Sequence, residues 1–381
     1  MNDASNIRQL TSLRFFAAFW VVLFHYWPKL DFDAAIPLFV QKGYLGVELF
    51  FVLSGFILCH VYRTSLEEGR FRYGSFLWNR LARVYPLHLA TLVGMIVLAL
   101  GAQAAGFGID SNILSWESLP ANLLLVQAWG LAPQAAFNHP SWSISAEWFA
   151  YLTFPLFAWG ALALKDRPMI ALGLAIGFLA GLYAAFQHFA GFPLTQATIQ
   201  WGALRIVPCF AYGCALHALW RARPSQNRRS ALVGAVASTL AVLILAAIAA
   251  PDAVIVTALG AVIFFLARMA QTGSETFGNA QLVYLGEISY SVYMVCVPWK
   301  LLAVGLAAKL TDAPDKHLQI FVWLAIVALL PVVAAMSYHL VEHPARKALR
   351  GLAVHRRKVS DTNMKHGDMP KQLATGREPV A

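Results

Sequence analysis

The sequence predicts an all-α membrane protein, a polytopic bundle of about ten transmembrane helices with both termini in the cytoplasm. Of its 381 residues, 59% are hydrophobic and only 13% are charged, whereas a soluble domain is nearer half apolar and a quarter charged. Apolar runs of about twenty residues recur along the chain, and each is long enough to cross a bilayer as a helix. Basic residues gather in alternate loops, which is the pattern expected of cytoplasmic loops.

The apolar runs divide the chain into ten predicted spans. These lie near residues 10–28, 43–62, 84–104, 143–164, 169–188, 200–219, 231–250, 252–270, 282–310 and 318–341. They form one membrane domain, residues 1–350, and the polar residues 351–381 are expected to be a disordered cytoplasmic tail. The N-terminus lacks the basic stretch and the cleavage site of a signal peptide, so we expect the first span to remain in the mature protein.

The net charge of +10 follows this topology and does not indicate a nucleic-acid partner. Most basic residues fall in the loops after the even-numbered spans: Arg63, Arg70, Arg72, Arg80, Arg83, Lys165, Arg167, Arg221, Arg223, Arg228, Arg229, Arg268, Arg346, Lys347 and Arg350. The opposite loops hold little beyond Lys29, Lys42, Lys309 and Lys316. The four cysteines, Cys59, Cys209, Cys214 and Cys296, lie in apolar runs without metal-binding or disulfide spacing, so we expect packing residues and no metal.

The first span, TSLRFFAAFWVVLFHYWP, carries only two side chains that hold a strong charge or a proton, Arg14 and His25. Eleven positions along a helix return to within roughly 20° of the starting direction, so both side chains share one face. The rise between them is about 16 Å, roughly half of a bilayer's hydrocarbon core. Either the pair faces a polar interior and is functional, or Arg14 reaches the cytoplasmic headgroups while His25 sits in the outer interface.

Further polar residues are predicted at the outer depth of His25. Glu48 lies in GYLGVELFFVLSGF, Glu147 in SWSISAEWFAYLTFP and Arg205 in WGALRIVPCF. Ser143 and Glu147 are four residues apart and therefore line one helix face. Lone charges in lipid are costly, so we expect these side chains to surround a wet cavity, with structural pairing of Glu48 and Arg205 as the alternative.

A second polar layer is predicted at the cytoplasmic side. Arg80 and Arg83 are three residues apart before the third span, so they present a two-pronged basic face. Guanidinium groups suit phosphates, although plain anchoring by positive charge also explains the pair. The gap between the two layers suits an extended arm about as long as a pantetheine chain. The layers therefore suggest a phosphorylated carrier on one side and, at His25, a general base on the other.

Several of these segments resemble the membrane acyltransferase-3 family, bacterial integral-membrane O-acyltransferases that act on glycans. The resemblance covers about residues 8–350 and rests on the spacing of Arg14 and His25, GYLGVELFFVLSGF, the R-x-x-R-x-x-P beginning at Arg80, SWSISAEWFAYLTFP, LGEISYSVYMVCVP and YHLVEHPARKALR. It implies an inner-membrane enzyme that moves an acyl group, usually acetyl from cytoplasmic acetyl-CoA, onto a hydroxyl of an extracytoplasmic polysaccharide or other glycoside. This sequence departs from the family pattern at Cys296, where histidine is usual, and at Glu48, where aspartate is common.

The resemblance implies that His25 is the catalytic histidine, that Arg14 is its partner in the donor channel and that Glu147 is the motif's acidic residue. It also implies that Arg80 and Arg83 lie at the acetyl-CoA end. We therefore assign catalytic roles to His25, Glu147 and Arg14, donor binding to Arg14, Arg80 and Arg83, and substrate binding to Glu48, Trp142, Ser143 and Arg205.

In the predicted mechanism His25, helped by Glu147 or Glu48, deprotonates the acceptor hydroxyl, and Arg205 or Trp142 stabilises the oxyanion. Direct transfer and a transient acyl-histidine both remain open. So do transfer of a succinyl or other acyl group and, as a less favoured alternative, a polysaccharide or proton-coupled transporter. Choice of the acceptor is expected to depend on the long outer loop, residues 105–142.

Overall fold

The computed structural model describes residues 7–31, 35–106, 110–313 and 317–352. Within these ranges, nine helices are long and apolar enough to cross a membrane. They are α1 (Arg8–Tyr26), α3 (Gly46–Glu67), α4 (Tyr73–Ala104), α8 (Pro168–Ala190), α9 (Gly202–Ala222), α10 (Arg228–Ala247), α11 (Asp252–Gln271), α13 (Ser289–Leu310) and α14 (Ile320–Ser337). Large apolar side chains such as Phe189 and Phe321, 86% and 81% exposed, cover the outside of the bundle, as a lipid-facing surface requires. The predicted fold class is confirmed.

The fourth predicted span, 143–164, is broken into α6 (Trp142–Leu152) and α7 (Phe154–Ala163). The break lies at Thr153, just before Pro155 at the start of α7. Proline lacks the backbone N–H that would continue the helical ladder, so the first helix ends there. Thr153 Oγ1 instead donates to the carbonyl of Phe149 at 2.8 Å.

Three other predicted boundaries also change. The third span starts earlier, at Tyr73, so Arg80 and Arg83 lie within α4 itself. The ninth span consists of α12 (Ala280–Glu287) and α13, separated at Ile288. The last span continues past α14 through a π-helical turn, Tyr338–Glu342, into a further helical stretch, residues 343–352, which we call the closing segment. The predicted tail, 351–381, falls almost entirely outside the described residues.

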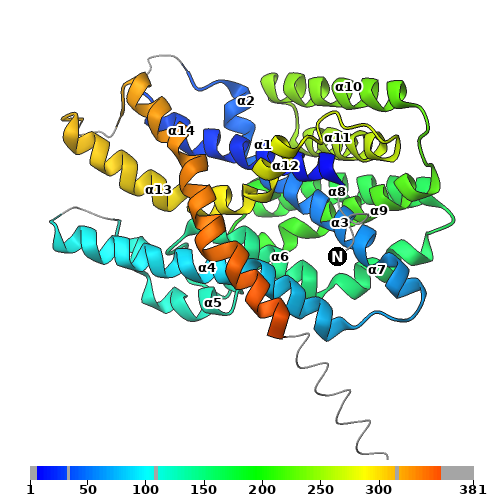
Figure 1. Ribbon diagram of the computed structural model, residues 1–381, viewed down its shortest axis with the longest axis horizontal. Helices are drawn as coiled ribbons and strands as arrows, with labels where there is room; N and C mark the ends of the chain where they lie inside the picture. The colour runs from blue at the N-terminus through cyan, green and yellow to red at the C-terminus, as the bar shows by residue number, and fades with distance from the viewer. Residues whose placement is uncertain (1–6, 32–34, 107–109, 314–316, 353–381) are drawn as a thin grey trace, which may run out of the picture.

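Helix α1 lies in the middle of the bundle, where it packs against α3, α11, α12 and α13 (Figure 1). The first predicted span is therefore the element that the other helices surround. Helices α3 and α9 cross at Gly55 and Gly213, where a Cβ atom would collide with the carbonyl groups of Phe210 and Val52. Absence of side chains at these two positions lets the helix backbones touch, which sets the position of Glu48 on α3 relative to Arg205 on α9.

Candidate active site

Two cavities hold most of the predicted site residues. The first, which we call the arginine cavity, has a volume of about 370 Å³ and is lined by Arg14, Arg80, Arg83, Ser143 and Glu147. The second, which we call the histidine cavity, measures about 840 Å³ and is lined by His25, Trp142 and Arg205. Glu48 lines neither of them. The structure thus divides the predicted residues between two sites along α1.

The arginine cavity contains charged residues that the sequence analysis did not select. Besides Arg14, Arg80, Arg83 and Glu147, it is lined by Glu287, Glu342, Arg346 and Arg350. The last three come from the end of the chain, where Glu342, Arg346 and Arg350 recur every four residues. That spacing places them on one helix face. The sequence analysis interpreted Arg346 and Arg350 only as basic residues of a cytoplasmic segment.

Arg80 is 5% exposed and lies over the ring of Tyr62, with its guanidinium carbon 5.6 Å from the ring centre. Its Nη2 donates to the Tyr62 hydroxyl at 3.4 Å, while its buried Nε has no hydrogen-bond partner. In the described part of the chain, Arg14, Arg80 and Arg83 form no ion pair with a carboxylate within 4 Å. Although Glu147, Glu287 and Glu342 also line the cavity, these three guanidinium groups are left available to an anionic ligand.

Glu147 faces the arginine cavity, where its Oε1 accepts a hydrogen bond from Ser54 at 2.6 Å. Ser54 belongs to the FFVLSGF segment of α3. His25 lies in the other cavity, so the predicted assistance of His25 by Glu147 does not occur in the structure. The helix rise gave the depth of Glu147, but the direction of its side chain around α6 decides which cavity it reaches.

His25 lines the histidine cavity with no carboxylate partner. Among the described residues its ring nitrogens make no hydrogen bond or ion pair, and Lys300 Nζ lies 3.4 Å from its backbone oxygen. His139, from the loop before α6, lines the same cavity. Burial lowers the pKa of His139, and the charges of Lys300 and Arg205 lower that pKa further, so His139 is neutral at pH 7. Two imidazoles and an ammonium group thus surround this end of α1.

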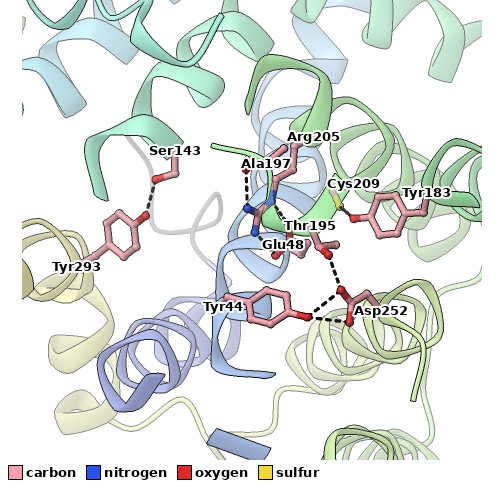
Figure 2. A network of polar contacts seen from close by, with 10 residues as sticks. All are labelled: Tyr44, Glu48, Ser143, Tyr183, Thr195, Ala197, Arg205, Cys209, Asp252 and Tyr293. Carbon is pink, nitrogen blue, oxygen red and sulfur yellow. Dashed lines mark hydrogen bonds and ion pairs between the residues drawn. The ribbon is translucent and has the colours of Figure 1, made fainter. Parts of the chain in front are cut away.

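Glu48 and Arg205 form a buried ion pair, as the alternative prediction held. Arg205 Nε and Nη2 donate to the two carboxylate oxygens of Glu48 at 2.5 and 3.0 Å, and Nη1 donates to the carbonyl of Ala197 at 2.8 Å (Figure 2). The guanidinium carbon lies 4.6 Å from the ring centre of Trp142. Because Glu48 and Arg205 are 0% and 2% exposed and already paired, Glu48 is not available to assist His25. The structure therefore does not support the prediction that Glu48 assists His25 in deprotonating the acceptor.

Asp252 forms hydrogen bonds with two segments around the histidine cavity, residues 42–44 and Thr195. It accepts a hydrogen bond from Lys42 Nζ at 2.6 Å. It also accepts from the Tyr44 hydroxyl at 2.9 Å and from Thr195 Oγ1 (Figure 2). Lys42, Tyr44 and Thr195 all line the cavity, together with Gln41, Gln196 and Thr198. Of the described residues in the predicted acceptor loop, 105–142, His139, Pro140 and Trp142 line it. Sequence reasoning missed the 36–44 and 195–198 segments because neither carries an unusual motif.

The two cavities are neighbours, and Val47 and Tyr293 line both of them. The Tyr293 hydroxyl accepts from Ser143 Oγ at 2.8 Å (Figure 2) and donates to the carbonyl of Pro140 at 3.0 Å. Ser143 therefore lies at the junction, on the side of the arginine cavity. The side chain of Cys296 is fully buried, lines neither cavity and donates its S–H to the carbonyl of Tyr293 at 3.0 Å. This geometry gives the thiol a packing role.

Comparison with known proteins gives a consistent result. The profile of the acyltransferase domain family (acyltransferase-3) matches residues 7–340. The acyltransferase MdmB of Streptomyces mycarofaciens is 31% identical over 320 residues, which cover 75% of this chain and 77% of MdmB. The peptidoglycan O-acetyltransferase OatA of Listeria monocytogenes is 25% identical over 371 residues, which cover 90% of this chain and 56% of OatA.

A putative O-acetyltransferase of Staphylococcus aureus is 22% identical over 369 residues, covering 89% of this chain and 57% of that protein. The chain thus spans little more than half the length of OatA and of the staphylococcal relative. No solved structure matches it. The family match extends over nearly all of the described helices and includes Arg14, His25, Arg80, Arg83 and Glu147. The chain therefore belongs to the acyltransferase-3 family and is a multi-pass membrane acyltransferase.

Proposed function

We propose that this protein is an O-acetyltransferase of the bacterial inner membrane. It moves an acetyl group from cytoplasmic acetyl-CoA to a hydroxyl of an extracytoplasmic polysaccharide or other glycoside. The observation that carries the proposal is a pair of neighbouring cavities, one that contains Arg14, Arg80 and Arg83 and one that contains His25, with Val47 and Tyr293 lining both. The printed names of OatA and of the staphylococcal relative support the acetyl group, and that of OatA supports a glycan acceptor.

The donor enters the arginine cavity from the cytoplasm. Arg80 and Arg83 bind phosphate oxygens of acetyl-CoA, and the pantetheine arm extends past Arg14 towards the junction of the cavities. Charge-assisted hydrogen bonds from guanidinium groups to phosphate are about twice as strong as neutral ones, which favours this orientation. Glu147, held by Ser54 in the same cavity, is positioned to accept from an amide N–H of the arm and to offset the charge of Arg14.

The acceptor enters the histidine cavity from the opposite side. Its walls combine aromatic faces, Phe24 and Trp142, with amide and hydroxyl side chains such as Gln41, Gln196 and Thr198. Sugar rings present apolar faces and many hydroxyl groups, so a wall of this composition suits a glycoside. The Glu48–Arg205 pair supports this wall by holding Trp142 and the backbone at Ala197.

The neutral imidazole of His25 takes the proton of the acceptor hydroxyl as its oxygen attacks the thioester carbonyl. The tetrahedral intermediate collapses with cleavage of the carbon–sulfur bond. The CoA thiolate then takes the proton from the His25 imidazolium and leaves as the thiol, and the acetyl ester stays on the acceptor. Because no carboxylate among the described residues pairs with the His25 ring, a single imidazole carries both proton transfers in this scheme.

The direct test replaces His25 with alanine. We expect ester-linked acetate on the cell-surface glycans of a complemented deletion strain to fall by about 10²- to 10⁴-fold, the usual contribution of a general base. A matched control is His188→Ala, because His188 is exposed at the end of α8 and lines neither cavity. Unchanged acetylation in the His25→Ala strain, at normal protein level, would defeat the assignment.

A binding experiment separates the enzyme from a transporter. Purified His25→Ala protein is expected to bind acetyl-CoA saturably and as tightly as the wild type, because the donor phosphates bind in the other cavity. A transporter of polysaccharide or protons has no reason to bind acetyl-CoA. Competition by succinyl-CoA in the same assay tests whether a longer acyl group is the true donor.

A further inference from the structure

Resting on the proposed use of acetyl-CoA, we propose that Arg350 of the closing segment, together with Arg80, forms a dedicated site for a phosphomonoester, the 3′-phosphate of the donor. The family match ends at residue 340, so Arg350 lies beyond it. Arg350 lines the arginine cavity with Arg80. This assignment gives the end of the chain a function in donor recognition.

The closing segment is fixed against the beginning of α4. The indole nitrogen of Trp78, in the second turn of α4, donates to the carbonyl of Leu349 at 2.9 Å. Trp78 and Leu349 are close in sequence to Arg80 and Arg350, so this bond sets the two arginines at the same end of the cavity. Figure 1 shows the end of the helix that follows α14 crossing the start of α4.

Both arginines have unused hydrogen-bonding capacity. The buried Nε atoms of Arg80 and Arg350 have no hydrogen-bond partner. Within the described residues neither forms an ion pair with a carboxylate, whereas Arg346, one turn earlier on the closing segment, lies 3.5 Å from Glu342. Arg80 and Arg350 line one cavity, and two like charges there repel each other, so a dianion bound to both relieves that repulsion.

The order of groups in the donor decides which phosphate binds there. In coenzyme A the thioester comes first, then the pantetheine arm, the pyrophosphate and finally the ribose with its 3′-phosphate. Arg80 precedes Arg83 by three residues, about 4.5 Å along α4, and α4 starts at the end of the cavity that holds Arg350. With the thioester at the junction near Val47, the pyrophosphate falls near Arg83 and the 3′-phosphate near Arg80 and Arg350.

The test compares binding of coenzyme A and 3′-dephospho-coenzyme A to the purified full-length chain by titration calorimetry. We expect the wild type to bind coenzyme A about 10- to 100-fold more tightly than the dephospho form, the range of one or two charge-assisted hydrogen bonds. Arg350→Gln should lower this ratio by about 10-fold, the loss of one charge-assisted hydrogen bond, without changing the dissociation constant for the dephospho form. That unchanged constant shows that the variant is folded.

Two further variants sharpen the result. Lys347→Gln, at an exposed position on the same segment, should keep the wild-type ratio. Arg83→Gln should weaken binding of both compounds by the same factor, because both carry the pyrophosphate. If wild-type protein binds coenzyme A and Arg350→Gln keeps the preference, the 3′-phosphate assignment is wrong while the proposed function stands. If the wild type binds neither compound, both proposals fail.

Discussion

Arg205 and Arg83 are both arginines on transmembrane helices, and the molecule uses them in opposite ways. Arg205 is 2% exposed and has Nε, Nη1 and Nη2 engaged, two with Glu48 and one with Ala197. Arg83 lines a cavity and has no ion-pair partner among the described residues. A buried and paired arginine such as Arg205 holds helices in place, whereas an unpaired arginine in a cavity, such as Arg83, is available to bind a ligand.

The same distinction separates the two carboxylates that the sequence suggested for catalysis. Glu48 is fully buried and both of its oxygens accept from one guanidinium group. Glu147 accepts one hydrogen bond from a hydroxyl and faces the cavity that contains Arg14. A carboxylate with free lone pairs in a cavity can meet a substrate, whereas one closed off by a partner contributes to packing. Three substitutions test how far this comparison holds.

The largest effect is expected from breaking the buried pair. Arg205→Met leaves the Glu48 carboxylate buried without its partner, which typically costs about 3–5 kcal/mol of unfolding free energy. We expect a large loss of thermal stability in detergent, measured by the temperature at which the protein aggregates. The double variant Glu48→Met with Arg205→Met should recover most of that loss, because apolar replacement of a buried pair is often neutral or stabilising.

The double variant also decides whether the pair has a second role. If it is stable but transfers no acetyl group, Glu48 or Arg205 contacts the acceptor, as the sequence analysis predicted. If it is stable and active, the pair serves only the architecture. A wild-type melting temperature in the Arg205→Met single variant would contradict the comparison itself.

An intermediate effect is expected from removing an unpaired arginine. Arg83→Gln should leave thermal stability unchanged or slightly raised, because it removes like charge from a cavity with several arginines. The KM for acetyl-CoA should rise by about 10- to 100-fold, corresponding to one or two charge-assisted hydrogen bonds to phosphate. The measurement is the donor dependence of acetyl transfer in membrane vesicles. A stability loss like that of Arg205→Met, with an unchanged KM for acetyl-CoA, would mean that Arg83 stabilises the fold and does not bind the donor.

Much of the fold was predictable because apolar length and loop charge are local properties of the sequence. The breaks at Thr153 and Ile288 were not predicted, since hydropathy averages over a window and does not register where a backbone hydrogen bond is lost. The extension of the last helix to Leu352 was missed for a similar reason, because residues 342–352 alternate charged and apolar positions instead of forming an apolar run.

The sequence suggested part of the lining of the two cavities, and the roles of these residues stay a prediction. Arg14, Arg80, Arg83 and Glu147 meet in one cavity, and each was selected as an ionisable residue in or beside an apolar helix. The separation of Arg80 and Arg83 from His25 follows from the two predicted layers, whereas that of Glu147 depends on the direction in which its side chain points around α6, which the sequence does not give. Arg350 was overlooked because the positive-inside pattern already explained a basic residue at that position.

The smallest effect is expected at Arg63, which pairs with Glu67 one turn later on α3, at 2.8 Å. Pairs at this spacing on a helix surface contribute only about 0.3–0.5 kcal/mol, and Glu67 keeps a second partner in Arg221 at 3.4 Å. Arg63→Gln should therefore change neither the melting temperature measurably nor the KM for acetyl-CoA by more than about twofold. Because Arg63 lines neither cavity, a tenfold rise in KM would mean that donor binding depends on the overall positive charge of this end of the bundle. Donor affinity would then not depend specifically on the unpaired guanidinium groups inside the arginine cavity. The contrast between Arg83 and Arg205 would then not explain donor binding.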